Sequence, residues 1–224
     1  MHDIRLRMTL LPTLIFVVLA LALAITDGDL WWGDLLYRLE GGSWALRGSW
    51  ITNDLIHDRG RNLVALMALT LFLGILLSFS MQKFRSWRRP LLYLLCSALI
   101  SAAIVGLLKD TTGMDCPWDL DRYGGDKAYV SLLGTRPEGQ EPGRCFPAGH
   151  ASGAYCWLGL FFLALRYRPS WRYGVLAAVV ALGLTFGVAQ QLRGAHFVSH
   201  DLWTVYICWM SAALCYYWVF RLER

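Results

Sequence analysis

The sequence predicts an all-α integral membrane protein with six transmembrane helices, forming one domain over residues 1–224. Three observations support this fold class. The chain is 56% hydrophobic, whereas a soluble domain is roughly 45–50% apolar. Its apolar residues form runs of about 18, and 18 helical residues span about 27 Å, close to the ~30 Å hydrocarbon core of a bilayer. Eleven tryptophans and ten tyrosines fit the aromatic belts at membrane surfaces.

The first expected span covers residues 8–25 and follows a basic start with Arg5 and Arg7. It could instead be a signal peptide, because the small residues Ala22-Leu23-Ala24 resemble a cleavage site. The run is long for the apolar part of a signal peptide, so we expect a retained helix. Residues 26–61 mix acids and aromatics, and are expected to lie at the interface with one or two short amphipathic helices.

The other five expected spans cover residues 62–80, 91–108, 150–167, 174–192 and 202–220. Short basic loops join the second span to the third and the fourth to the fifth. The third and fourth spans are joined by the long polar loop 109–149, and the fifth and sixth by the short loop 193–201. A loop as long as 109–149 is usually either functional or disordered.

Charge predicts the orientation of the chain. One side of the predicted bundle holds both termini and the two basic loops, with eleven Lys and Arg against two acids. The other side holds 26–61, 109–149 and 193–201, with ten Lys and Arg against fourteen acids. The positive-inside rule then places both termini in the cytoplasm and these three loops outside.

Two histidine segments lie where outer loops become apolar spans. In Pro147-Ala148-Gly149-His150, the glycine allows close backbone approach and His150 enters the first turn of a helix, where free N–H groups favour an anion such as phosphate. His196 lies in a similar segment downstream. Lys109, which ends the third span, lies on the same outer side. This convergence indicates phosphate-ester chemistry on a lipid.

Each residue alone also fits an ordinary interfacial role. Lys109 could extend its ammonium group to the membrane surface, as many lysines do, and His150 and His196 could be hydrogen-bonded interfacial groups. Arg193 could be an interfacial charge, although beside His196 it can also bind two phosphate oxygens. For His57 we expect a structural or surface role.

Metal binding is the rival interpretation of a histidine cluster. His196 and His200 are four residues apart and could share a helical face. The sequence has no His-Glu-x-x-His pattern and no Cys-x-x-Cys pair, so we expect neither a catalytic metal nor an organic cofactor.

At these segments the chain resembles the type 2 phosphatidic acid phosphatase superfamily, the membrane lipid phosphatases related to vanadium haloperoxidases. The family pattern is Lys-x6-Arg-Pro, then Pro-Ser-Gly-His, then Ser-Arg-x5-His-x3-Asp. Here Lys109 leads the first motif, His150 ends the second and His196 belongs to the third. The three motifs fall in family order, and the six-span layout covers nearly the whole chain.

The chain departs from the family pattern at several positions. Cysteine and alanine replace the arginine of the first motif and the serine of the second, at Cys116 and Ala148. In the third motif Gln190 holds the usual arginine position, while Arg193 lies three residues before the histidine. His200 holds the usual aspartate position, and Asp201 follows it.

The resemblance implies a mechanism with a phosphohistidine intermediate. His196 would attack phosphorus, while His150 would protonate the leaving group and then help to activate water. Lys109 and Arg193 would bind the phosphate oxygens together with the backbone at Gly149. Arg144, six residues before His150, could replace the arginine missing at Cys116.

The group that orients His196 has two candidates. A carboxylate would fix the tautomer of the imidazole and stabilise its developing charge, which favours Asp201. In a regular helix starting at His196, His200 has the better angle, and Asp201 needs one extra residue or a wide turn before Leu202. On charge we nevertheless expect Asp201 to orient His196, with His200 supporting it or binding phosphate.

Cys116 and Cys145 are the two cysteines in polar loops, and both lie in the oxidising outer compartment if the orientation holds. We therefore expect a disulfide between them, with two free thiols as the alternative.

The sequence thus predicts a hydrolase that removes phosphate from a lipid phosphate or diphosphate at the outer leaflet. A lipid phosphotransferase using the same intermediate is the first alternative, and a non-enzymatic protein that binds anionic lipid is the second. We expect a multi-pass protein of a bacterial cytoplasmic (inner) membrane, with its site facing the periplasm or exterior. Its partners would be the lipid substrate and membrane lipids and not nucleic acid; the sequence leaves the substrate and oligomeric state open.

Overall fold

The computed structural model describes residues 2–132 and 134–220. Within these ranges the chain forms helices and loops, and the β-type pairing is confined to an isolated bridge between Leu120 and Lys127. Five helical segments in the same ranges are long and apolar enough to cross a membrane. The expectation of an all-α chain with several helices long and apolar enough to span a membrane is therefore confirmed.

The five long helices are α1 (His2–Ile25), α3 (Arg59–Ser80), α4 (Arg88–Thr112), α7 (Arg172–Leu192) and α8 (Val198–Phe220). Each coincides with an expected span but begins two to six residues earlier. The expected fourth span is helical in three pieces: α5 (Gly149–Tyr155), the 3-10 turn η6 (Cys156–Leu158) and α6 (Gly159–Tyr167). Where the sequence predicts six spans, the structure thus has five uninterrupted helices and one interrupted run.

The interrupted run lies at the centre of the bundle. Tyr155, Leu158 and Phe162 are buried in one apolar cluster with Tyr93 of α4 and Cys208 of α8. Because other helices cover this run, it does not need the uniformly apolar surface of a lipid-facing helix.

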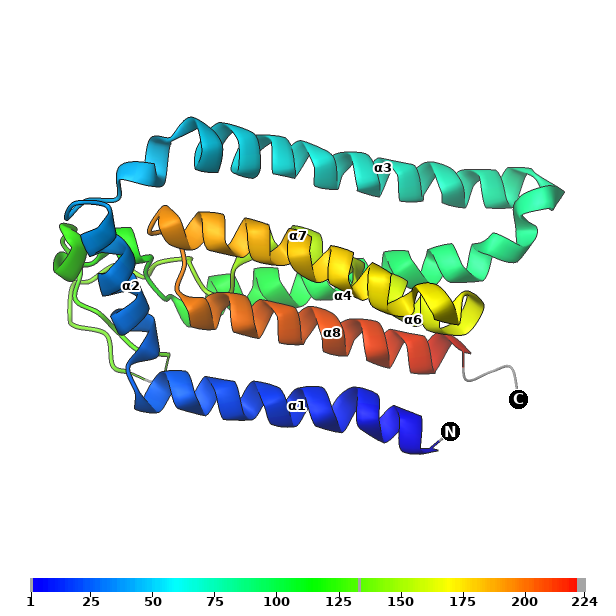
Figure 1. Cartoon of the computed structure of the whole chain (residues 1–224), viewed down its shortest axis with the longest axis horizontal. Helices are drawn as coiled ribbons and strands as arrows, with labels where there is room; N and C mark the ends of the chain where they lie inside the picture. The colour runs from blue at the N-terminus through cyan, green and yellow to red at the C-terminus, as the bar shows by residue number, and fades with distance from the viewer. Residues whose placement is uncertain (1, 133, 221–224) are drawn as a thin grey trace.

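α1 and α3 lie on the outside of the bundle (Figure 1). α1 packs against α8, where the Trp209 indole donates to the Met8 carbonyl at 2.8 Å. Both outer helices carry rows of exposed large apolar side chains, including Leu10, Leu14, Val18, Leu66, Leu69 and Leu73. Lipid contact accounts for so large an apolar surface.

The expected interfacial segment 26–61 is more helical than predicted. It forms α2 (Gly28–Leu39), the 3-10 turn η1 (Ala45–Gly48), the π-helix η2 (Trp50–Asp58) and the first turn of α3. α2 lies across the end of the bundle where α7 ends and α8 begins, while α1 begins at the opposite end (Figure 1). Two further 3-10 turns are connections: η3 (Gln82–Trp87) joins α3 to α4, and η7 (Pro169–Trp171) joins α6 to α7.

The long loop after α4 is folded onto this end of the bundle. It contains η4 (Pro117–Asp119) and η5 (Asp121–Tyr123), and a buried carboxylate, Asp115, holds its distant parts together. Asp115 accepts hydrogen bonds from Lys127 at 2.7 Å, from Arg136 at 3.0 Å and from Gln140 at 3.0 Å. Such a network fixes the path of the loop that leads into α5.

Candidate active site

A pair of histidines lies between α7 and α8. His196 is in the short connection before α8 and His200 is in the first turn of α8, and their Nδ1 atoms are 3.3 Å apart. His196 is 8% exposed and His200 is fully buried. Burial holds the pKa of His196 well below its ordinary value, and His200 and Lys109 lower it further. The His196 imidazole is therefore neutral at neutral pH and has a nitrogen lone pair available.

Asp201 faces α7 rather than His196. Its Oδ2 atom accepts a hydrogen bond from the Gln191 amide at 2.6 Å. The carboxylate also packs against Gly187, where an added Cβ would lie 2.8 Å from Cγ of Asp201. The wide turn required for Asp201 to reach His196 is absent, because α8 already begins at Val198 and is regular from there. The contact expected of Asp201 is therefore made by His200, the residue with the better helical angle.

Lys109 reaches from the end of α4 to the start of α5. Its ammonium group donates to the Arg144 carbonyl at 2.9 Å. A Cβ on Gly149 would lie 2.8 Å from Cε of Lys109, so the glycine is what allows this approach. Lys109 also lies near enough to His196 to lower the pKa of its imidazole, so residues of the first, second and third sequence motifs lie near one another.

The Arg144 side chain lies away from these groups. Its guanidinium forms an exposed ion pair with Asp110, and the side chain is 74% exposed. Arg144 therefore contributes its backbone carbonyl, through Lys109, and the structure does not bring its charge to the histidine pair.

Arg193 is buried and fixed by three hydrogen bonds. It donates to the Asn53 side chain at 2.7 Å, to the Arg47 carbonyl at 3.1 Å and to the Gln190 side chain at 3.2 Å. A guanidinium has five N–H donors, so donors remain for a ligand. Gln190, which holds the usual arginine position, thus orients the arginine that is present.

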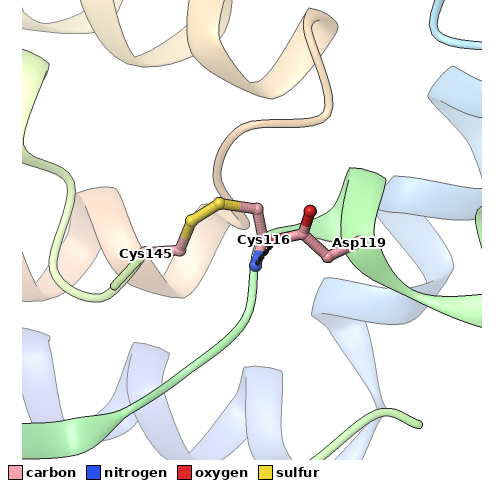
Figure 2. Close-up of side chains that lie close together, drawn as sticks. All are labelled: Cys116, Asp119 and Cys145. Atoms are coloured by element: carbon pink, nitrogen blue, oxygen red, sulfur yellow. Dashed lines mark hydrogen bonds between the residues drawn. A yellow bond between two sulfur atoms is a disulfide. The ribbon is translucent and has the colours of Figure 1, made fainter. Parts of the chain in front are cut away.

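Cys116 and Cys145 are joined in a disulfide with a Cα–Cα distance of 5.2 Å (Figure 2). The Cys145 N–H donates to the Met114 carbonyl at 2.9 Å, and the Cys145 backbone lies within reach of the His196 and His200 rings. The disulfide therefore ties the end of α4 to the segment that lies beside the histidine pair.

Asp119 lies beside the two sulfurs, and the three side chains are close enough in space to hold a metal ion (Figure 2). The disulfide uses both sulfurs, however, and thiolates rather than disulfide sulfurs are metal ligands. Asp119 has a structural role here, since its carboxylate accepts a hydrogen bond from the Cys116 N–H at 3.4 Å.

His150 lies against a residue for which the sequence predicted only a structural or surface role. The rings of His150 and His57 are stacked, with centroids 4.7 Å apart and 28° between their planes. The Phe186 ring of α7 also packs against the His150 ring, with centroids 4.5 Å apart. The Nε2 atom of His150 is buried without a hydrogen-bond partner among the described residues. The sequence indicates only that His57 lies on the outer side with His150. The contact between the two rings depends on the tertiary fold.

A cavity of about 450 Å³ opens between the end of α1 and the start of α8. Apolar side chains make up much of its wall, among them Ala24, Leu30, Met114, Phe146 and Trp203. The Phe146 ring also contacts His200, with centroids 5.3 Å apart. One aromatic side chain therefore separates this cavity from the histidine pair.

Comparison with protein families matches residues 90–224 to the family described as the PAP2 superfamily. The matched region contains Lys109, His150 and His196, and it begins in α4 after the outer helices α1 and α3. Neither the curated proteins nor the solved structures contain a match to the chain.

Proposed function

The chain belongs to the PAP2 superfamily, and we propose that it hydrolyses a lipid phosphate or diphosphate at the outer leaflet through a phosphohistidine intermediate. The observation that carries this proposal is the buried contact between His196 and His200 beside Lys109. It supplies a neutral, oriented imidazole next to a positive charge, which is what a nucleophile for a phosphate ester needs.

In the first step Nε2 of His196 attacks phosphorus, and the bond from phosphorus to the leaving oxygen breaks. For Nε2 to have a free lone pair, Nδ1 of His196 must carry the proton. Its N–H then donates a hydrogen bond to Nδ1 of His200. His200 is then the positioning residue, in place of a carboxylate. His150 gives its proton to the leaving oxygen, so that the lipid departs as a neutral hydroxyl group, or as a phosphate when the substrate is a diphosphate.

In the second step water attacks the phosphohistidine, and the phosphorus–nitrogen bond breaks. His150, which is now neutral, accepts a proton from that water, and inorganic phosphate leaves. Lys109 and the remaining N–H donors of Arg193 bind the phosphate oxygens in both steps, which stabilises the charge spread over them in the transition state.

The location of these groups fits a lipid substrate. They lie at one end of the bundle, which is the outer end if the Lys and Arg asymmetry sets the orientation. A phosphate at that depth would be in the headgroup region, and the apolar cavity between α1 and α8 could take part of a lipid chain. These features favour a multi-pass protein of a bacterial cytoplasmic membrane that acts on its outer leaflet.

The test is phosphate release by the purified protein in detergent, with a panel of phosphatidic acid, phosphatidylglycerol phosphate, undecaprenyl diphosphate and a lipid A phosphate. The wild type should release phosphate from at least one lipid, and His196→Ala should release none. Cys96→Ser, at an exposed cysteine of α4, is the control and should behave as the wild type. Release by His196→Ala at the wild-type rate, or no release from any lipid, would overturn the proposal. Transfer of labelled phosphate to a second lipid would identify a phosphotransferase instead.

A further inference from the structure

The η2 π-helix lies outside the region matched to the family, yet two of its side chains point at the candidate site. Asn53 binds Arg193, and His57 stacks on His150. Residues 53 and 57 are four apart, so they occupy one face of this helix. π-helices are rare and are found frequently at functional sites.

We propose that η2 is part of the active site and that His57 is a positioning residue, which holds the His150 ring in the orientation for proton transfer. This inference rests on the proposed function, in which His150 protonates the leaving group.

The His150 ring is held by contacts from two elements. His57 stacks on it from η2, and Phe186 contacts it from α7 with centroids 4.5 Å apart. The Ile56 backbone also lies within hydrogen-bonding reach of the ring. Without His57 the ring would keep Phe186 alone as an aromatic neighbour among the described residues, and it could turn about its Cβ–Cγ bond.

A glycine, Gly60, allows the start of α3 to approach the Phe186 ring that contacts His150. A Cβ on Gly60 would lie 3.5 Å from Nε2 of His150 and 2.8 Å from the Phe186 ring. Nε2 is buried and has no hydrogen-bond partner in the described structure, so it is free to hydrogen-bond to an atom of the substrate. His57 and Gly60, which lie on either side of the first residue of α3, thus determine how the two aromatic neighbours pack against the His150 ring.

The His57 ring is itself fixed by its neighbour, because its Nδ1 atom is 3.2 Å from the Asp58 carboxylate. Asp58 also acts electrostatically on Arg193, and Arg193 and Arg61 act on His150. The end of η2 therefore lies near Arg193, which is assigned to bind phosphate, and near His150, which is assigned to transfer the proton.

A comparison of two leaving groups separates positioning from a general loss of structure. An alkyl lipid phosphate needs a proton on its leaving oxygen, whereas p-nitrophenyl phosphate has a leaving group that departs without one. A residue that positions the proton donor should lower kcat/KM, which reports the phosphorylation of His196, more for the alkyl substrate than for the aryl substrate. A residue needed only for folding should lower both equally.

We expect His57→Ala to lower kcat/KM for the alkyl substrate on the order of tenfold more than for the aryl substrate, since general acid catalysis as a whole contributes ~10²–10⁴. His57→Phe keeps a flat ring stacked on His150, so it should retain most of the alkyl activity that His57→Ala loses. Leu55→Ala on an exposed part of the same helix is the matched control and should leave the ratio unchanged.

His150→Ala measured alongside distinguishes the two levels of the argument. If the wild type releases no phosphate, or if His150→Ala lowers kcat/KM equally for both substrates, the proposed function fails. If His150→Ala shows the split and His57→Ala lowers both substrates equally or neither, the role of His57 is refuted. If His57→Ala does not fold, a His57→Phe protein that loses the alkyl reaction selectively would also refute positioning by the stacked ring.

Discussion

Removal of the Cys116–Cys145 disulfide should weaken both the stability of the protein and its activity. The perturbation is Cys116→Ser combined with Cys145→Ser. The bond closes a loop with a sequence separation of 29, from the end of α4 to the segment before α5. Two effects follow, one on the unfolded chain and one on the site.

The effect on stability comes from chain entropy. Closing a loop of this length lowers the entropy of the unfolded chain by about 12 cal/mol/K, which is about 3.6 kcal/mol at 25 °C. The buried Asp115 network holds other parts of the same loop, so some order survives without the bond. We expect the free energy of unfolding to fall by about 2–4 kcal/mol.

The effect on activity comes from the backbone beside the histidine pair. The Cys145 backbone lies within reach of the His196 and His200 rings, and the neighbouring Arg144 carbonyl holds Lys109. Loss of the bond should therefore lower phosphate release even at temperatures where the protein remains folded.

The assay is equilibrium unfolding in mixed detergent micelles, with phosphate release measured on the same samples. Cys96→Ser is the control, because it removes a thiol without touching the loop. Alkylation without reduction, followed by mass spectrometry, should leave Cys116 and Cys145 unmodified in the wild type. Alkylation of both, or a change in unfolding free energy below about 1 kcal/mol, would refute the reasoning.

Three further predictions concern orientation, the orienting residue and pH. Reporter fusions after residues 85, 130 and 170 should read cytoplasmic, external and cytoplasmic, and a cytoplasmic signal at 130 would contradict the proposed outer site. His200→Phe, which keeps a buried ring but removes Nδ1, should lower turnover at least tenfold more than Asp201→Asn; the reverse ranking would return the role to Asp201. The Arg122 hydrogen bonds hold the pKa of Asp34 below its ordinary value, so this pair should stabilise the protein at neutral pH and lose that effect as the pH falls below about 3.9. In unfolding measurements Asp34→Asn should cost up to about 1 kcal/mol at pH 7 and nothing near pH 2, and an unchanged cost at low pH would contradict this assignment.

The long helices could be predicted from the sequence because hydropathy and length suffice for a helix that faces lipid. The central run 149–167 shows the limit of that argument. Its composition is apolar enough for a span, but its 3-10 turn at Cys156–Leu158 occurs in a segment packed on all sides by other helices. Local pattern alone does not specify where such a buried helix is interrupted.

Sequence motifs indicate which residues belong to the candidate site, but not which contacts these residues make. Lys109 and Arg193 were named from the sequence, but the Arg144 side chain turns to Asp110 on the surface. The choice between His200 and Asp201 depended on where α8 begins, and helix boundaries are the least certain part of a sequence-based prediction.

The contact between His57 and His150 was outside the reach of sequence reasoning. It joins η2 to α5, two elements separated by the whole of α3 and α4. Charge placed both residues on the outer side, but a pairing between distant segments depends on how the helices pack, and neither residue carries a local signal for the other.

The central claim is that His196 carries the phosphoryl group during turnover, and the most direct measurement is to trap that intermediate. The purified protein would be mixed with a lipid substrate labelled in its terminal phosphate and denatured in alkali within one turnover, because phosphohistidine is stable in base and labile in acid. The account predicts label on a peptide that contains His196 in the wild type, none in His196→Ala, and more label in His150→Ala with an aryl substrate, since water activation is impaired there. Label on a different residue, or equal labelling in His196→Ala, would contradict the account.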